Sequence, residues 1–175
     1  CACMAERMAV DRSLAYQSGS TALFLAAASI LVALGFQYIG GYYPCPLCFM
    51  QRYAFYFAIP ALFAALALSS GGERNAATIL FGLVALAFLA NAGLGVYHAG
   101  AEWKFWPGPD TCAGAQAVST AAGDLIKSLE TTRVVRCDEA AIRVLGLSFA
   151  GWNVIASLVI AGLSARAATA ARKNF

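Results

Sequence analysis

Four internal cysteines are the residues of this chain best suited to chemistry. Cys45 and Cys48 are separated by two residues, a spacing that lets a pair close into a small disulfide ring whose reduction potential is tuned by strain and nearby charge. Cys112 and Cys137 lie far from them and far from each other, and could be joined by a second disulfide. Six cysteines in 175 residues also favour an oxidising compartment for at least some of them. The pattern predicts thiol–disulfide redox chemistry.

Two side chains are expected to act on the first pair. Arg52 follows Cys48 by four residues, so the two share a face, one turn apart, if a helix has begun there. The guanidinium would then stabilise a thiolate on Cys48, as would the positive end of the helix dipole. His98 closes the third apolar run at the same membrane face and is a candidate proton or hydrogen-bond donor.

Cysteine pairs also serve in haem attachment, zinc binding and structural disulfides. Haem attachment requires a histidine directly after the pair, but Phe49 stands there. A zinc site and a purely structural disulfide stay open as alternatives. Against them, Cys112 and Cys137 lack the close spacing of a zinc knuckle, and a two-residue ring gains little closure entropy. We therefore assign no metal ligands, and we give Cys1 and Cys3 no role.

The composition indicates a membrane protein. Charged residues make up 12% of the chain, against about 25% in a soluble domain, which is too few to cover a surface that faces water. Crossing the bilayer takes about 20 apolar residues, and four apolar runs come close to that length, at 20–40, 53–70, 75–97 and 144–165. We expect an all-α integral membrane protein, with residues 1–175 forming a single membrane domain built as a four-transmembrane-helix bundle. Buried helices of a soluble protein would leave too little polar sequence to cover them, and the first run is longer than the apolar core of a signal peptide.

The connections between these runs set the topology. With four spans, the short loop 40–52 and the long loop 99–143 lie on one side, while both termini lie on the other. Lys and Arg divide equally between the two sides, six against six, so charge does not orient the chain. The internal cysteines favour an oxidising face for the loops and a cytoplasmic location for both termini. Apolar residues at helical spacing from Val118 to Leu129 predict a short amphipathic interfacial helix in the long loop.

In combination, these residues resemble the DsbB family of bacterial disulfide bond formation proteins. The resemblance covers Ala15–Ala168 and depends on the order, spacing and topology of the motifs together. The motifs are Pro44-Cys45-Pro46-Leu47-Cys48 with Gln51-Arg52, Tyr97-His98, Glu102–Pro109, and Leu145–Ser148 before Gly151-Trp152-Asn153. One departure is Gln51, where some members carry an acidic residue, so we give it no catalytic role.

The resemblance implies a route for electrons across the bacterial inner membrane. A DsbA-like periplasmic thioredoxin-fold protein would attack the Cys112–Cys137 disulfide, with Cys112 forming the mixed disulfide. Cys45 and Cys48 would be reduced next, and Cys48 would pass two electrons to ubiquinone or menaquinone. Arg52 and His98 would lie at the quinone site. The DsbA–DsbB–quinone system is the general example of how a periplasm is kept oxidising.

One observation from the residues themselves agrees with a quinone. Thiol oxidation needs a two-electron acceptor, and the sequence has neither a dinucleotide-binding fingerprint nor a haem motif. A membrane protein can instead use a carrier dissolved in the bilayer. The sequence has no basic stripe interleaved with aromatic residues, so nucleic acid is not expected as a partner.

Two further hypotheses remain. A vitamin-K-epoxide-reductase-like enzyme also uses a membrane bundle and two cysteine pairs, but it usually carries its C-x-x-C pair late in the chain. A non-enzymatic tetraspan protein that binds zinc or holds structural disulfides belongs to a different class. Metal analysis and thiol trapping would separate it from an oxidase.

Overall fold

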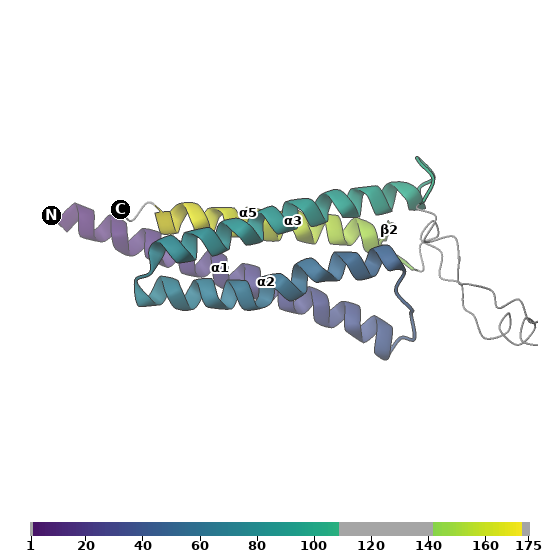
Figure 1. Cartoon of the computed structure of the whole chain (residues 1–175), viewed down its shortest axis with the longest axis horizontal. Coiled ribbons are helices and arrows are strands. Elements are labelled where there is room, and N and C mark those ends of the chain that lie inside the picture. The colour runs from purple at the N-terminus through teal and green to yellow at the C-terminus, as the bar shows by residue number, and fades with distance from the viewer. Residues whose placement is uncertain (1, 109–141, 173–175) are drawn as a thin grey trace, which may run out of the picture.

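The computed structural model describes residues 2–108 and 142–172, which form four long helices joined into one bundle (Figure 1). These are α1 (Ala2–Tyr38), α2 (Pro46–Gly71), α3 (Arg74–Glu102) and α5 (Phe149–Arg172). A two-residue antiparallel pair, β1 (Arg143–Val144) with β2 (Leu147–Ser148), leads into α5. The start of α1 and the end of α5 lie at one end of the bundle, and the α1–α2 connection lies at the other (Figure 1).

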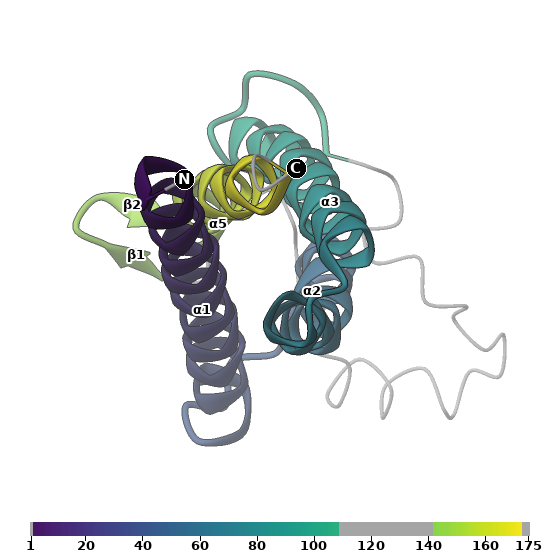
Figure 2. The same ribbon diagram turned by 90° about the vertical axis from the view of Figure 1, so that its left-hand side faces the viewer.

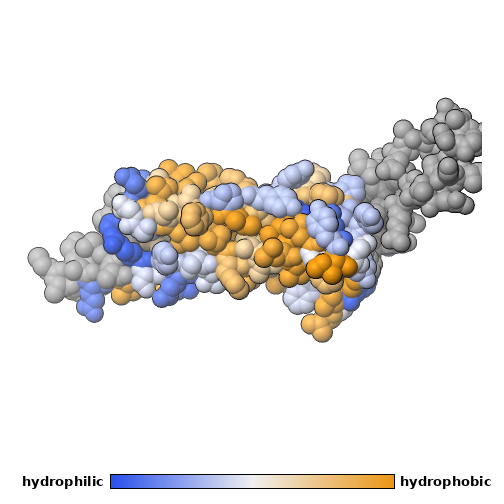
Figure 3. Space-filling view, turned by 90° about the horizontal axis from the view of Figure 1, so that it is seen from below, coloured by the Kyte–Doolittle hydropathy of each residue, from blue (hydrophilic) through white to orange (hydrophobic). Residues whose placement is uncertain are grey.

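Each helix is long and apolar enough to cross a membrane, with spans at Val10–Tyr38, Pro46–Gly71, Arg74–Glu102 and Phe149–Arg172. The bundle interior is built from small and aromatic side chains, such as the fully buried Ala58, Phe81 and Phe88. Large apolar side chains such as Phe24 and Phe63 are exposed instead, and apolar residues cover the middle of the visible surface (Figure 3). An apolar exterior over an apolar interior suits lipid as the solvent. The predicted four-span, all-α bundle is confirmed.

The second helix begins at Pro46, earlier than the expected 53. Proline is favoured in the first turn because its missing N–H would have no partner there. Cys45 is the N-cap, with extended backbone (φ −72°, ψ 164°), and its Sγ accepts the backbone N–H of Cys48 at 3.3 Å. As a result, Cys48 and Arg52 lie on the first turns of a helix and not in a loop.

The boundaries of the other three helices also differ from expectation. α1 begins at Ala2, well before the expected 20, and its membrane-spanning part begins at Val10. α3 continues past 97 to Glu102, so His98 lies within the helix. α5 begins at Phe149, because residues 143–148 form a tight hairpin in which Leu145 and Gly146 have positive φ values of 54° and 83°. The amphipathic helix predicted between Val118 and Leu129 lies outside the described residues.

Viewed from the end, α5 lies between α1 and α3, and α2 lies beside α3 (Figure 2). Close approach of α3 and α5 depends on Gly95, where an added Cβ would lie 2.8 Å from Cγ2 of Val154. Small residues allow transmembrane helices to pack at short distance. This contact matters for function because α3 carries His98 and α5 carries Asn153.

Candidate functional site

The Cys45–Cys48 pair lies at the start of α2, with its two Sγ atoms 3.0 Å apart and both thiols free. The two sulfurs differ in exposure, because Cys45 is 4% exposed while Cys48 is half-buried and lines a cavity. The local sequence explains the closeness, since a cap residue and the third residue of a helix approach each other within one turn. The pair is therefore positioned to form a disulfide.

Cys45 precedes the membrane-spanning segment of α2, and its surroundings favour the thiolate. The hydrogen bond with the Cys48 thiol, followed by the one with His98, holds the pKa of Cys45 well below its ordinary value in spite of burial. The sulfur lies 3.6 Å from Nε2 of His98. Because the thiolate is the reactive form of cysteine, this arrangement prepares Cys45 for exchange at neutral pH.

His98 is 2% exposed and lies behind the pair, on the side of Cys45. Its Nδ1 is 3.0 Å from Nε2 of Gln51, and its Nε2 is 3.7 Å from Oε1 of Glu102. Glu102 is itself buried, and its Oε2 has no hydrogen-bond partner among the described residues. The ligand atoms of Cys45, Cys48 and His98 all lie within 4.8 Å of one another, close enough to share a metal ion.

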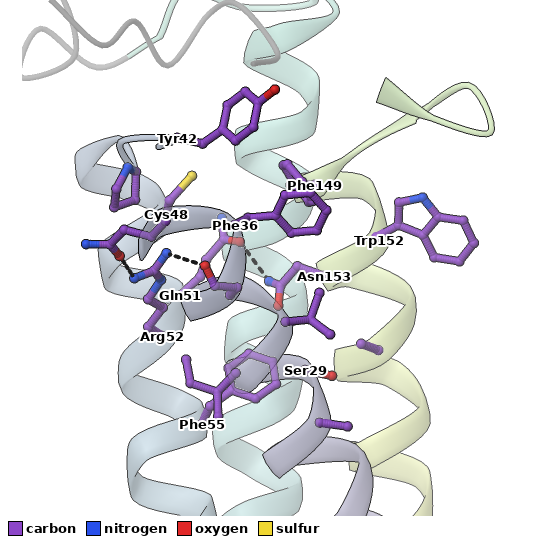
Figure 4. A pocket seen from close by; sticks show the side chains of 18 of the residues that line it. Ser29, Phe36, Tyr42, Cys48, Gln51, Arg52, Phe55, Phe149, Trp152 and Asn153 are labelled. Carbon is purple, nitrogen blue, oxygen red and sulfur yellow. Dashed lines mark hydrogen bonds between the residues drawn. The ribbon is translucent and has the colours of Figure 1, made fainter. Parts of the chain in front are cut away.

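A row of amide side chains continues from Gln51 into the bundle. Asn153 donates from Nδ2 to Oε1 of Gln51 at 2.8 Å, a contact drawn in Figure 4. Asn91 donates from Nδ2 to Oγ of Ser157 at 3.0 Å and to Oδ1 of Asn153 at 3.4 Å. Three helices, α2, α3 and α5, thus contribute to one largely buried polar network.

A cavity of about 420 Å³ lies between α1, α2 and α5, next to Cys48 (Figure 4). Most of its wall is apolar and aromatic, and it includes Phe36, Phe55 and Phe149. Most of the polar side chains gather toward Cys48, among them Gln37, Gln51, Arg52 and Asn153, while Ser29 lies deeper in the bundle (Figure 4). The cavity therefore suits an apolar molecule with a few hydrogen-bonding atoms at one end.

Arg52 is 8% exposed and is held in place on the cavity wall. Its guanidinium donates to Oε1 of Gln37 and to the backbone oxygen of Ala33, both on α1. It also lies 5.3 Å from the ring centroid of Phe49. A buried, permanently charged donor at the polar end of the cavity can bind a partly negative oxygen or sulfur.

Four of the six predicted site residues come together here: Cys45, Cys48, Arg52 and His98. Cys48 and Arg52 both line the cavity, as their helical spacing indicated. His98, predicted as a quinone contact, is not among the lining residues and contacts Cys45 instead. Cys112 and Cys137 lie outside the described residues.

The side chains that connect these residues had no predicted role; they are Gln37, Gln51, Asn91, Glu102 and Asn153. A signal was available for most of them. Polar residues inside transmembrane segments are costly and therefore mark functional positions by default. Gln37, Asn91 and Asn153 each interrupt an apolar run.

Comparison with known proteins decides the family. A family model described as "Disulfide bond formation protein DsbB" matches residues 18–167. The chain belongs to the DsbB family. It is 30% identical to disulfide bond formation protein B of Cupriavidus necator, over 91% of this chain and 99% of that protein. It is 31% identical to the protein of the same name from Marinobacter nauticus, over 81% and 86%.

No solved structure matches the chain significantly. Membership of the DsbB family, together with four membrane spans, makes the chain a multi-pass membrane protein of disulfide bond formation. The free cysteine pair at the start of α2 is the part of the described structure that can do such chemistry.

Proposed function

We propose that this DsbB-family protein is a quinone-dependent thiol oxidase. It takes electrons from a DsbA-like periplasmic protein through Cys112 and Cys137, passes them to Cys45 and Cys48, and delivers them to ubiquinone or menaquinone. The observation that carries the proposal is the position of Cys48 on the wall of an apolar cavity that also holds Arg52. One member of the reactive pair thus meets a site suited to a lipid-soluble acceptor.

The residues of the cavity fit a quinone. Its volume of about 420 Å³ falls within the usual range for small-molecule sites. Aromatic walls suit a flat ring and an isoprenoid tail, while Arg52, Gln51 and Asn153 supply polar atoms for ring carbonyls. A bound quinone would supply an acceptor for two electrons and two protons.

The chain's own residues supply the rest of the chemistry. Forming the Cys45–Cys48 disulfide from two thiols releases two electrons and two protons, which balances the reduction of one quinone to quinol. Arg52 stabilises negative charge on the Cys48 sulfur and orients the acceptor. His98 acts on the Cys45 sulfur and not on the quinone, because it contacts that sulfur and does not line the cavity.

The same proposal places the protein in the bacterial inner membrane, with both termini in the cytoplasm and the cysteine loops in the periplasm. Its support is that the start of α2, which carries the cysteine pair, lies at the opposite end of the bundle from the start of α1 and the end of α5 (Figure 1). A soluble periplasmic donor would then meet the loop end of the bundle.

The decisive experiment is quinone reduction by the purified protein with a reduced DsbA-like protein as electron donor. Cys48→Ser should abolish quinone reduction, and Cys112→Ser should prevent the mixed disulfide with the donor. Cys3→Ser is the matched control, and it should leave turnover unchanged. Full turnover in Cys48→Ser would overturn the mechanism.

A zinc-binding protein is the second candidate, because Cys45, Cys48 and His98 could share a metal ion. Zinc sites usually complete a tetrahedron with a fourth ligand. Stoichiometric zinc on the purified protein, combined with absent quinone reduction, would favour this candidate over the oxidase.

A further inference from the structure

A row of hydrogen-bonded amide side chains, Asn91, Asn153 and Gln51, ends at His98 beside the cysteine pair. Along this row, each amide donates to the next residue. Asn91 is 4% exposed, Gln51 is 5% exposed and His98 is 2% exposed, while Asn153 is half-buried on the cavity wall, so bulk water reaches little of this row. In such surroundings a polar group that loses its partner is costly, and each contact in the row constrains the next one. The orientation of one amide is therefore passed along the row.

The contacts determine which nitrogen of His98 carries the proton. Asn153 donates to Oε1 of Gln51, and this places the other amide atom, Nε2, against Nδ1 of His98 at 3.0 Å. An amide NH₂ can only donate, so Nδ1 must accept. A neutral imidazole whose Nδ1 accepts carries its proton on Nε2.

The opposite side of the ring leads to the same assignment. Nε2 of His98 faces the Cys45 sulfur at 3.6 Å and Oε1 of Glu102 at 3.7 Å. A thiolate and a carboxylate are both acceptors, so they favour a proton between them and the ring. Two further groups touch the partners of His98 and not its ring. The Cys48 thiol of α2 contacts Cys45, and the uncharged Asn153 of α5 contacts Gln51. Arg52 is bonded to α1 instead.

We propose that Asn153 is a positioning residue, which acts through Gln51 to hold His98 in the tautomer protonated on Nε2 and so keeps a hydrogen-bond donor directed at the Cys45 sulfur. The donor stabilises the thiolate, the form in which this sulfur attacks or departs during exchange. The inference rests on the proposed function only in taking Cys45 as an exchanging thiol. Neither of its tests involves a quinone, so failure of one idea can be told from failure of the other.

The first test uses the fact that His98 is the only histidine in the sequence. Histidine labelled with ¹⁵N therefore gives a single imidazole, whose nitrogen shifts report the tautomer directly. In the reduced protein we expect the form protonated on Nε2, and in Asn153→Leu we expect a mixture of tautomers, because Gln51 is then free to turn. Unchanged shifts in Asn153→Leu, or a native ring protonated on Nδ1, would overturn the proposal.

Should Asn153→Leu fail to assemble, Gln51→Leu removes the same connection from α2 and is expected to give the same mixture of tautomers. Ser164→Ala is the control for a buried change on α5, since Ser164 is fully buried and its Oγ has no partner among the described residues. It should leave both ¹⁵N shifts in place.

The second test measures the pH midpoint of Cys45 alkylation, resolved by mass spectrometry, because the midpoint follows the thiolate fraction and not access to the sulfur. Loss of one hydrogen bond should raise the midpoint in Asn153→Leu by about half to one pH unit. In a His98→Ala background, Asn153→Leu should cause no further shift, since both changes remove the same donor. Additive shifts would show that Asn153 acts by another route and would overturn the proposal.

Discussion

The two sulfurs of the Cys45–Cys48 pair are 3.0 Å apart, yet they face different surroundings. Cys48 opens onto an apolar cavity with Arg52 on its wall, while Cys45 is buried against His98. This asymmetry suits a pair that exchanges with another disulfide through one sulfur and delivers electrons through the other.

Replacing Arg52 should weaken binding of the acceptor more than it slows the chemistry. Arg52→Ala removes a charge-assisted donor worth about 1.5–3 kcal/mol, so KM for quinone should rise by about 10-fold to 100-fold. Arg52→Lys keeps the charge but loses the planar guanidinium, so its KM for quinone should lie between the values of the native protein and of Arg52→Ala. Steady-state quinone reduction separates KM from kcat.

The control for Arg52 is Arg143→Ala, because Arg143 lies against Trp103, 5.9 Å from its ring, and does not line the cavity. It should leave KM for quinone unchanged. An unaltered KM in Arg52→Ala would remove Arg52 from the proposed acceptor site.

Alkylation of Cys45 should persist to lower pH in the folded protein than in the denatured protein. The pKa of this thiol is lowered by hydrogen bonds from Cys48 and then His98, so the thiolate is present at neutral pH and is lost only as the pH falls through the lowered value. Alkylation rates of Cys45, measured from pH 4 to 10 on the native and the denatured chain, test the direction of this pKa shift. Equal midpoints in the two states would contradict it.

At the residue scale, local spacing could be predicted and long-range contact could not. Cys48 and Arg52 were expected on one face because four residues make about one helical turn, and both line the cavity. The contacts of His98 with Cys45 and Gln51 join α3 to the start of α2. Nothing in a single sequence specifies which turns of two distant helices meet, so His98 was expected at the acceptor instead.

Among the elements, the start of α2 is the one whose position most affects function. The apolar run suggested a beginning near 53, because hydrophobicity marks the part of a helix that lies in lipid and not its capped end. Pro46 was the available signal, since proline is favoured in the first helical turn. Because α2 begins at Pro46, the second cysteine of the pair, Cys48, is fixed on a helix.

The contact between α3 and α5 should be sensitive to added volume at Gly95. In Gly95→Leu, the new side chain would begin 2.8 Å from Cγ2 of Val154, and overpacking of this kind costs about 1–3 kcal/mol in the free energy of unfolding. Unfolding in mixed micelles or a thermal stability assay would measure the loss.

Gly93→Leu is the matched control on the same helix, because no atom lies within 4 Å of a Cβ built there. It should not lower stability, because the position is open and leucine favours a helix more than glycine does. Equal losses in the two variants would show that close packing of α3 on α5 at Gly95 is not what limits stability.

For the whole molecule, the number of spans follows from composition, whereas their arrangement does not. Four apolar runs could only be hidden in lipid, and the four helices are long enough to cross it. The placing of α5 between α1 and α3 depends on which small residues face each other (Figure 2). Many arrangements bury similar runs, so periodicity alone does not choose among them.

The orientation of the bundle can be tested with reporters fused to the C-terminus. We expect green fluorescent protein to fluoresce there and alkaline phosphatase to stay inactive, because the proposed topology puts both termini in the cytoplasm. A fusion placed after residue 108 should give the opposite pair of results. Active phosphatase at the C-terminus would reverse the topology and would separate the cysteine loops from a periplasmic donor.

The cavity beside Cys48 is walled by α1 on one side and by α2 and α5 on the others, and its lining includes Val32, which is 57% exposed within the membrane-spanning part of α1. A hydrophobic substrate would therefore arrive by lateral diffusion within the bilayer and not from water. Its effective concentration would be a mole fraction in lipid. Turnover at a fixed amount of quinone should then fall as more lipid is added, since dilution occurs in two dimensions.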